Sequence, residues 1–398
     1  MLHKRDSKHE CTNYRGISLL DVMSKLYEKV LDHRMQALQA VVAPGKGVQP
    51  EQLGFSPNHR VEDAVHGLVE GVKHNRNDGN RVVILLSADV KKAYPSMPRG
   101  KMLEAVADMG VTGQLYLAIA ATYDGNESVV LTSDTQVVSG SYDVNDGLRE
   151  GAVLSPRLYN IFMAGLVRQL KRDAVRKPTK KNKDANIGMQ VGEVWMGAQM
   201  WADDLIVATS HADWETAKEY MKVLMRSTKE WADSHGVRFC DDKSKVLVIG
   251  KQFSGACEQT ERPGVSKTKW PIGTEKKSSK YLGVTIGKRM EWKAHVADIV
   301  SLSKPKHRQV QPLAANPHVD PAVVERAWEQ KVPPCLLKGL AGLSMQSEAL
   351  WRNLDTAVGE GARQVLGMHK FANGDLACSE LGWRPARARV QIQQFAYM

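Results

Sequence analysis

Three aspartates lie in apolar stretches of the sequence, where carboxylates are unexpected. Asp89 closes the run VVILLSAD, and Asp203 and Asp204 interrupt MWADDLIVA. Burying a carboxylate in such a setting costs free energy unless a cation or hydrogen bonds compensate. Mg²⁺ provides this compensation, because it prefers oxygen ligands and commonly keeps substrate phosphates as the others. The three acids therefore indicate a two-metal site for nucleotidyl transfer by in-line displacement.

An adjacent acidic pair is weak evidence for a metal site when it is taken by itself. Such pairs more often lie in a solvated turn or cap a helix, and this alternative applies to Asp203 and Asp204. The metal interpretation therefore depends on the elements and motifs around the pair.

The elements that would position these acids follow from hydrophobic spacing. The run at 82–90 is short and rich in Val, Ile and Leu, which predicts a buried strand that ends close to Asp89. Residues 191–210 predict two strands that meet near Gly197 or at the acidic pair itself. We expect helices over the ranges 19–34, 61–75, 99–123, 152–171 and 213–236.

The rest of the chain contains further strand candidates and a helical end. Residues 127–139 and the segment KVLVIG within 237–249 read as strands, and KYLGVTI at 280–286 alternates like one. The range 251–279 has no periodicity and predicts a loop with a short strand. Most of the chain after residue 286 is expected to be helical, with interruptions at Pro305, Pro312, Pro317, Pro321, Pro333 and Pro334.

The charge of the chain favours a polyanionic partner. The 398 residues carry a formal charge of +11 with a pI near 9.3. Residues 251–310 contain 13 Lys and Arg but only 5 Asp and Glu, and a second basic run lies at 171–183. Because each phosphate that Lys or Arg neutralises releases condensed counterions, nucleic acid is the first candidate partner. A basic surface that is merely solvated is the alternative, and the clustering of the charge argues against it.

Cysteine spacing and hydropathy exclude other classes of protein. The five cysteines are scattered and form no C-x-x-C pair, which argues against structural zinc and a disulfide framework. No apolar run reaches the ~18–20 residues that span a bilayer, and the first residues lack the apolar core of a signal peptide. We therefore expect no membrane partner and an intracellular location, nuclear or cytoplasmic.

Several motifs occur in an order that resembles the reverse transcriptases of non-long-terminal-repeat (LINE-like) retrotransposons. The segment KRDSKHECTNYRGISLLDVMSKLYEKVLDHRM near the start resembles the fingers block of that family. Matching blocks follow at QLGFSPNHRVEDAV (52–65), ADVKKAYPSMPR (88–99), LREGAVLSPRLYNIFM (148–163) and KYLGVTIG (280–287). The block at 148–163 is the most specific, because helix propensity alone does not produce LSP followed by YNIFM.

The resemblance implies roles for residues around the three acids. Asp89, Asp203 and Asp204 would be the catalytic metal ligands, and Arg15 would contact the triphosphate, with Lys4 as a weaker basic match. The aromatic position that closes off the sugar 2′ side and favours deoxynucleotides falls on Tyr94. Core packing is the alternative role for this tyrosine.

The block at 148–163 would support the incoming nucleotide, and one of its residues departs from the family. Glu150 and Gly151 lie beside the expected triphosphate, and the family commonly has Gln in place of Glu150. A carboxylate there would repel the triphosphate. Ser56 and Asn58 also depart from the usual Arg and Gly.

The later blocks match less tightly. Lys243 matches a lysine that is a candidate general acid for pyrophosphate departure, although an exposed lysine at a strand edge is an equal alternative. Tyr281, Leu282 and Gly283 match the hairpin that grips the primer, where glycine permits close backbone approach. The segment SELGWRPARARV at 379–390 resembles a tail block, for which a turn between two helices is an equally good interpretation.

The resemblance implies an α+β fold of the right-hand polymerase type. We expect a small antiparallel palm sheet, fingers from 1–80 and part of 112–155, and a helical C-terminal region. The corresponding domains are 1–290 for fingers and palm and 291–398 for the thumb and C-terminal region. The implied activity is RNA-directed DNA synthesis with two Mg²⁺ ions, or Mn²⁺ instead, on an RNA template, a DNA primer and dNTPs. The oligomeric state stays open.

Two other functions compete with this one. The chain begins inside the first block and shows no upstream endonuclease and no downstream zinc motif, and Ser56, Asn58 and Glu150 depart from the family. These features favour a catalytically inactive RNA-binding module or a decayed element copy. An RNA-dependent RNA polymerase could share the acidic pair, but Tyr94 and the LSP block argue against it.

Overall fold

A computed structural model describes most of the chain. Its description leaves out residues 1, 4–6, 8, 11–12, 43–45, 78–80, 132–137, 176–186, 241–243, 251–273, 276, 346 and 396–398. The chain divides into two compact units. The first unit contains Met1–His59, Ile84–Lys245 and Ser266–Thr274, and the second contains Arg60–Val83, Val246–Val265 and Glu275–Met398.

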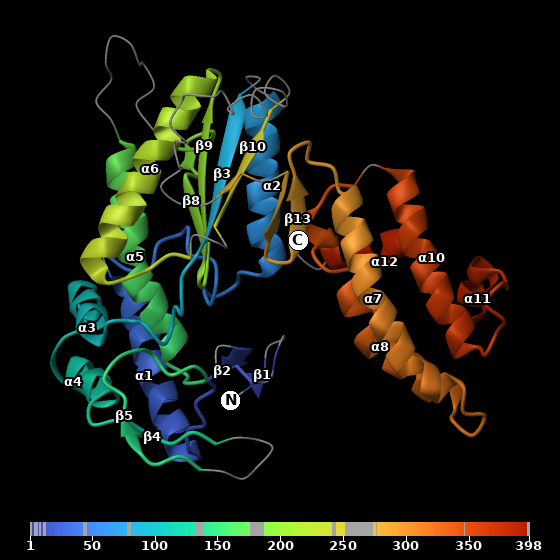
Figure 1. The fold of residues 1–398 in the computed structure, drawn as a ribbon, viewed down its shortest axis with the longest axis horizontal. Coiled ribbons are helices and arrows are strands. Elements are labelled where there is room, and N and C mark those ends of the chain that lie inside the picture. Colours follow the sequence, from blue (N-terminus) through green and yellow to red (C-terminus); the bar gives the residue numbers. More distant parts are fainter. Residues whose placement is uncertain are drawn as a thin grey trace. The chain divides into compact units, whose positions relative to one another are not determined.

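Three strands carry the acidic positions of the first unit (Figure 1). The central strand β9 (Asp204–His211) lies between β3 (Val82–Asp89) and β8 (Ala198–Trp201). Strands β8 and β9 form an antiparallel hairpin in which Trp201 lies opposite Asp204. The chain therefore turns at the acidic pair, one of the two places predicted from the sequence. Gly197 instead separates β8 from the short strand β7 (Val194–Trp195).

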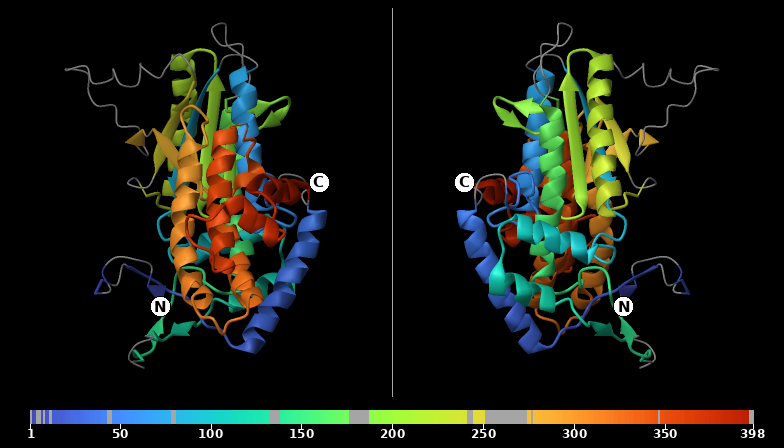
Figure 2. Two further views of the ribbon diagram at one scale, coloured as in Figure 1. Left: turned by 90° about the vertical axis from the view of Figure 1, so that its right-hand side faces the viewer. Right: turned by 90° about the vertical axis from the view of Figure 1, so that its left-hand side faces the viewer.

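Two long helices, α5 (Ser155–Ala174) and α6 (Trp214–His235), cover one side of these strands (Figures 1 and 2). Phe162 of α5 packs against Trp231 of α6 with ring centroids 5.3 Å apart. Both side chains are almost completely buried, which stabilises the fold by removing apolar surface from water. The remaining helices of the first unit are α1 (Val22–Val41), α3 (Arg99–Asp108) and α4 (Gly113–Ala121).

Two predictions for the first unit were wrong in detail. The single helix expected over 99–123 is divided into α3 and α4, because Gly110 adopts φ +101°, a conformation that ends a helix. The strand expected over 127–139 is reduced to β4 (Glu127–Ser128), which pairs with β5 (Tyr142–Asp143), and an isolated bridge between Leu131 and Val138. Residues 132–137 lie outside the described residues. The other short strands are β1 (Leu2–His3), β2 (Tyr14–Arg15) and β6 (Gln190–Val191), which pairs with β7.

The second unit is mostly helical, which confirms the expected helical C-terminal region and the α+β class. Its strands β12 (Ser278–Tyr281) and β13 (Val284–Gly287) form a hairpin, whereas the alternation at 280–286 suggested one strand. Its other elements are α2 (Val61–Asn77), α7 (Lys293–Ala314), α8 (Pro321–Lys331), α9 (Pro333–Leu336), a 3₁₀ turn at Leu340–Gly342, α10 (Glu348–Val365), α11 (Gly374–Glu380) and α12 (Ala386–Phe395). Strands β10 (Lys245–Ile249) and β11 (Thr274–Glu275) span the sequence boundary between the units.

Helix α7 continues through two prolines that were expected to interrupt it. Pro305 and Pro312 both lie inside it. Each proline removes one helical N–H donor. The buried side chains Val296, Ile299 and Val310 still lie along one helix, so the packing of this face outweighs the lost hydrogen bonds.

The tail segment at 379–390 has a packing role. Trp383, in the turn between α11 and α12, stacks on buried Trp328 with ring centroids 4.0 Å apart. Its indole N–H donates to Glu325 at 2.7 Å. Arg389 lies over both rings and pairs with Glu329 at 2.8 Å. The turn between two helices is therefore the interpretation that the structure supports.

Within the part of the chain that the structure describes, none of the helices is both long and apolar enough to cross a bilayer.

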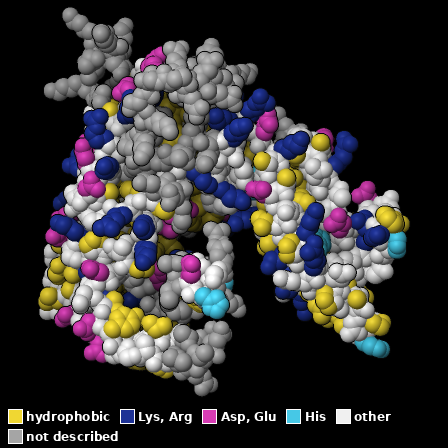
Figure 3. Space-filling model, in the orientation of Figure 1, with side chains coloured by type: hydrophobic (Ala, Val, Ile, Leu, Met, Phe, Trp, Pro, Cys, Tyr) yellow, Lys and Arg dark blue, Asp and Glu magenta, His cyan; other side chains and the backbone are white. Residues whose placement is uncertain are grey.

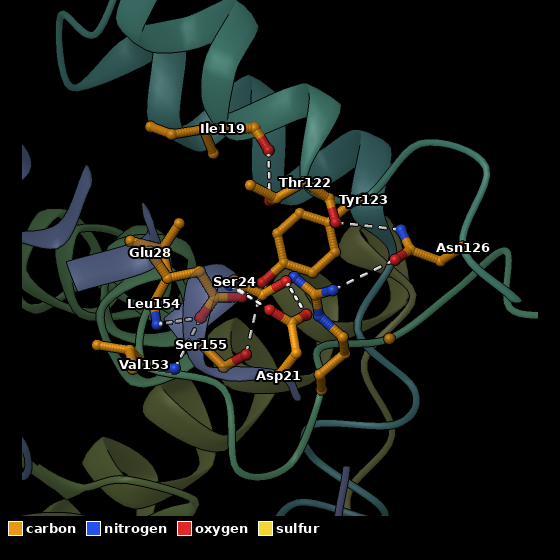
Figure 4. Close-up of polar contacts among 12 residues, drawn as sticks. Asp21, Ser24, Glu28, Ile119, Thr122, Tyr123, Asn126, Val153, Leu154 and Ser155 are labelled. Atoms are coloured by element: carbon orange, nitrogen blue, oxygen red, sulfur yellow. Dashed lines mark hydrogen bonds and ion pairs between the residues drawn. The ribbon is translucent and has the colours of Figure 1, made fainter. Parts of the chain in front are cut away.

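A buried acid of α1 holds the loop that leads into α5. Glu28 is 1% exposed and accepts hydrogen bonds from the backbone N–H groups of Val153 and Leu154 at 2.7 and 3.1 Å (Figure 4). Its other carboxylate oxygen pairs with Arg149 at 2.7 Å. The first N–H groups of a helix have no intrahelical acceptor and carry partial positive charge. Glu28 therefore fixes both the start of α5 and the position of residues 149–154.

We predict that Glu28→Gln destabilises the protein by about 1–3 kcal/mol, because it leaves a buried donor without an acceptor. The free energy of unfolding from chemical denaturation measures this loss. Glu104→Gln is the matched control, because Glu104 is an exposed residue of α3 paired only with Lys101, and such pairs contribute about 0–1 kcal/mol. Equal unfolding free energies for the two variants would contradict the role of Glu28.

Candidate functional site

The three predicted acids all act electrostatically on one buried tyrosine. Asp89 is the last residue of β3, Asp203 lies in the β8–β9 turn, and Asp204 begins β9. Tyr159 of α5 is 1% exposed. Burial raises the pKa of its phenol well above the ordinary value, and the negative charges of Asp203, Asp89 and Asp204 raise this pKa further. The structure thus brings the carboxylates into electrostatic range of the same hydroxyl.

The donor chemistry of this site fits Mg²⁺, since all three side chains offer carboxylate oxygens, the ligands that this ion prefers. Each of the three residues is half-buried. Within the described residues, no three His, Cys, Asp or Glu side chains form a ready-made metal-binding group. The acids therefore share one edge of the sheet, meaning the end where β3 stops at Asp89 and β9 begins at Asp204. They do not form a closed set of ligands.

Tyr94 lies directly on Tyr159. The two rings stack with centroids 5.1 Å apart and planes inclined by 11°. Burial raises the pKa of Tyr94, and the charges of Asp203 and Glu150 raise it further. Both phenol oxygens are buried, and neither has a hydrogen-bond partner among the described residues. The stack fixes the ring of Tyr94 next to the acidic edge of the sheet.

Arg15 and Glu150, both predicted near the triphosphate, form an ion pair with each other. The guanidinium Nε of Arg15 lies 2.5 Å from the Glu150 carboxylate, and the side chains are 56% and 19% exposed. The hydrogen bond and the charge of Glu150 raise the pKa of Arg15, and the charge of Asp203 raises it further. The negative charge of Glu150 is therefore already matched by a cation.

The backbone around Glu150 leaves room only for glycine at the next position. Gly151 has φ +108°, and a Cβ on it would lie 2.9 Å from the carbonyl oxygen of Ser18. The N–H of Ser18 donates to the carbonyl of Glu150 at 2.7 Å. The segment that follows β2 therefore packs against residues 150–151 without intervening side chains.

A second close approach supports the turn that contains Asp203. A Cβ on Gly54 would lie 2.5 Å from the backbone nitrogen of Ala202. Asn160 of α5 donates to the carbonyl of Gly54 at 2.7 Å, and Gln52 donates back to the carbonyl of Asn160 at 2.8 Å. These contacts hold the segment QLGF between α5 and the β8–β9 hairpin.

Several of these supporting residues were not predicted from the sequence. Asn160 stands in the apolar run YNIFM, which was the available signal. Glu28 had no such signal, because its helix-face neighbours include Ser24, Lys25 and Asp32. Asn58, which replaces the glycine usual in the family, has φ +61°. Asparagine tolerates this left-handed conformation better than other residues with a side chain, so the departure preserves the backbone geometry.

The predicted primer-grip residues form the turn of a tight hairpin in the second unit. Leu282 and Gly283 have φ +49° and +86°, and they connect Tyr281 to the opposite residue Val284. Two residues with positive φ suit the right-handed twist of a hairpin. Tyr281 is 2% exposed, so the turn presents mainly Leu282 and Gly283.

The described site residues divide between the two units. Arg15, Asp89, Tyr94, Glu150, Gly151, Asp203 and Asp204 lie in the first unit, whereas Tyr281, Leu282 and Gly283 lie in the second. Lys243, the predicted general acid, and Lys4 lie outside the described residues. Their roles stay predictions.

Comparison with known proteins identifies relatives of the chain. Residues 2–286 match the family model described as reverse transcriptase (RNA-dependent DNA polymerase). The RNA-directed DNA polymerase from the mobile element jockey of Drosophila melanogaster is 22% identical over 343 residues, which cover 85% of this chain and 34% of the relative. The probable RNA-directed DNA polymerase from the transposon X-element of the same species is 23% identical over 307 residues, covering 75% of this chain and 29% of the relative.

A solved structure of telomerase from Candida tropicalis in complex with a TWJ fragment of telomeric RNA is also similar. Its sequence identity is 11% and its TM-score 0.43, with coverage of 95% of this chain and 55% of that one.

The chain spans about a third of the length of the curated relatives. Those relatives are polymerases of non-long-terminal-repeat retrotransposons, as the sequence resemblance implied, and the family match brings with it the expected right-hand polymerase fold. Because the family model matches more than half of its residues, the chain belongs to the reverse transcriptase family.

Proposed function

We propose that this chain is the RNA-directed DNA polymerase of a LINE-like retroelement, extending a DNA primer on an RNA template with dNTPs. The observation that carries the proposal is the placement of Asp89, Asp203 and Asp204 at one sheet edge, within electrostatic range of Tyr159. Nucleotidyl transfer needs concentrated negative charge where divalent ions bind the triphosphate.

In this proposal Asp89, Asp203 and Asp204 hold two Mg²⁺ ions, with Mn²⁺ as the alternative. When bound, the ions stabilise charge on the attacking and leaving oxygens. The β8–β9 hairpin has Asp203 in its turn and Asp204 at the start of β9, while β3 supplies Asp89 from the adjacent strand. The protein's own contribution is to keep these carboxylates together despite their mutual repulsion.

Tyr94 is proposed to exclude ribonucleotides. Its ring cannot shift freely, because it stacks on Tyr159, which is itself buried. A fixed ring beside the acidic edge would fill the space that a 2′-hydroxyl needs. Discrimination would then arise from the ring itself, because the phenol oxygen of Tyr94 makes no hydrogen bond among the described residues.

Arg15 and Gly151 are proposed to contact the incoming triphosphate, with Glu150 as a competitor for Arg15. Arg15 is more than half exposed, so its guanidinium can turn from Glu150 to a phosphate. In the second unit, Tyr281, Leu282 and Gly283 would grip the primer end. The proposed domain limits are 1–290 for fingers and palm and 291–398 for the thumb and C-terminal region, and the proposed location is nuclear or cytoplasmic.

A catalytically inactive RNA-binding module is the second candidate, and the Arg15–Glu150 pair favours it. At 2.5 Å, the pair occupies a cation that the triphosphate would need. The two functions differ in one measurable property, which is primer extension by the unaltered chain.

Asp203→Asn is predicted to reduce primer extension on an RNA template with Mg²⁺ by at least about a hundredfold, because it removes charge from the transition-state site. RNA affinity should stay unchanged. Asp213→Asn is the control, because Asp213 caps α6 and Asn caps a helix equally well. Extension that is unaffected by Asp203→Asn, or no extension by the unaltered chain, would overturn the polymerase proposal.

Glu150→Gln tests the second candidate. We expect the KM for dNTP to fall about tenfold, since removing the carboxylate frees Arg15 and lessens repulsion of the triphosphate. Glu215→Gln, at an exposed position of α6 paired with Lys218, should leave the KM unchanged. Synthesis that appears only in Glu150→Gln would identify the unaltered chain as inactive, and a raised KM in that variant would assign Glu150 a positive role.

Tyr94→Ala is predicted to reduce the preference for dNTPs over rNTPs by about ten- to a hundredfold, because the space beside the sugar opens. The ratio of kcat/KM for the two substrates measures this preference. Tyr94→Phe should retain it, since the ring remains. If Tyr94→Phe relaxed the preference as much as Tyr94→Ala, the hydroxyl and not the ring would be responsible.

A further inference from the structure

The second unit contains an open pocket of about 620 Å³ at the end of the β12–β13 hairpin where Ser278 lies opposite Gly287. This is the end away from the Leu282–Gly283 turn. Each strand has four residues, so the two ends lie about 10 Å apart. The pocket is therefore distinct from the proposed primer grip.

Four cationic side chains from three segments line this pocket. Lys277 precedes β12, Lys288 and Arg289 follow β13, and Lys293 is the first residue of α7. Figure 3 shows Lys and Arg side chains gathered over this part of the second unit. Among the described lining residues, Glu291 is the single acid. The lining thus carries a net charge of about +3 at neutral pH.

Three of the four cations have no carboxylate partner among the described residues. In the part of the chain that the structure describes, no ion pair engages Lys277, Arg289 or Lys293. Like charges that gather in a concave site raise the local potential and concentrate anions there. The excess positive charge of the lining therefore favours the binding of an anion.

The backbone holds these side chains in a defined arrangement. The N–H of Lys288 donates to the carbonyl of Lys277 at 3.2 Å, and the N–H of Met290 donates to the carbonyl of Gly287 at 2.9 Å. Met290 has φ +56°, a conformation that costs a residue with a side chain about 1 kcal/mol or more and is often found at binding sites. This turn presents Lys288 and Arg289 together.

The first turn of α7 adds to the positive potential. It contains no acid, and its N-cap residue, Trp292, makes no side-chain cap hydrogen bond. The first N–H groups of the helix carry the positive end of the helix dipole. Val248, Ala294 and Ala297 supply apolar surface between the cations. Apolar surface bordered by cations matches a nucleotide, whose base has flat apolar faces and whose phosphate is charged.

We propose that this pocket binds the phosphodiester backbone of single-stranded RNA at a site separate from the primer grip. The inference rests on the proposed function for the choice of nucleic acid as the polyanion. A volume of about 620 Å³ admits one or two nucleotides. The site would hold RNA that is not paired with the primer.

The test replaces the four cations together, as Lys277→Gln, Lys288→Gln, Arg289→Gln and Lys293→Gln. Binding of an unstructured 20-nucleotide RNA is measured over a range of salt concentrations, without primer or dNTP. We expect the slope of log affinity against log salt to decrease by about 2–3, since each lost phosphate contact on a single strand contributes about 0.7. Affinity at low salt should fall at least tenfold.

The matched control carries the same charge change at exposed positions of the same unit, as Lys331→Gln, Arg352→Gln, Lys370→Gln and Arg384→Gln. Circular dichroism and melting temperature verify that both variants fold. An equal loss of RNA affinity in the two variants would overturn the proposal, because net charge alone would then explain it. Inorganic phosphate is tested as a competitor of RNA. If it displaces RNA when its concentration equals that of the RNA phosphate groups, the pocket binds single anions and the proposal is overturned.

This test is independent of catalysis. It is repeated in the Asp203→Asn protein, where no synthesis is expected but RNA binding should be retained. A normal pocket effect together with no primer extension by the unaltered chain would reject the polymerase proposal and support the pocket. Normal primer extension by the unaltered chain, with no loss of RNA affinity when the pocket cations are replaced, would support the polymerase proposal and reject the pocket.

Discussion

The placement of three carboxylates within electrostatic range of one buried tyrosine is the constraint on which the first unit depends. Asp203 lies in the two-residue turn, Asp204 begins the strand that follows it, and Asp89 ends the neighbouring strand, all at one edge of the sheet. Holding such charges together requires a rigid support and, in use, a compensating cation. The turn is rigid because Gly54 packs directly against it and buried Tyr159 lies beneath the same edge. The acidic site is thus maintained by apolar packing and backbone contacts.

Residues 149–154, the loop proposed to contact the nucleotide, are held in place by the buried carboxylate of Glu28. Glu28 reaches across from α1 to the backbone at the start of α5 and to Arg149. Arg157 strengthens the same junction by pairing with Asp32 of α1 at 2.5 Å. Residues 149–154 therefore have little freedom relative to α1. The position of Glu150 beside Arg15 follows from this framework and from the Ser18 contact.

In the second unit, the hairpin and α7 are fastened by one buried histidine. His295 accepts a hydrogen bond from the N–H of Thr285 at 3.4 Å, and its other ring nitrogen lies 3.0 Å from the carbonyl of Lys338. Burial lowers the pKa of His295, which keeps the ring neutral and able to serve both partners. The hairpin thereby has one end packed near Lys338 and the other end at the cationic pocket.

The sequence by itself determined the strand at 82–89, the main helices and the family, because hydrophobic periodicity and motif order are local properties. It also singled out Asp89, Asp203, Asp204, Tyr94 and Glu150. It did not reveal the break at Gly110, the hairpin at 278–287 or continuation of α7 through Pro305, since neighbouring segments decide these outcomes. The pairing of Glu150 with Arg15, the stack of Tyr94 on Tyr159 and the cationic pocket were decided only by the tertiary structure. Each depends on residues that are distant in the chain and meet only when their elements pack.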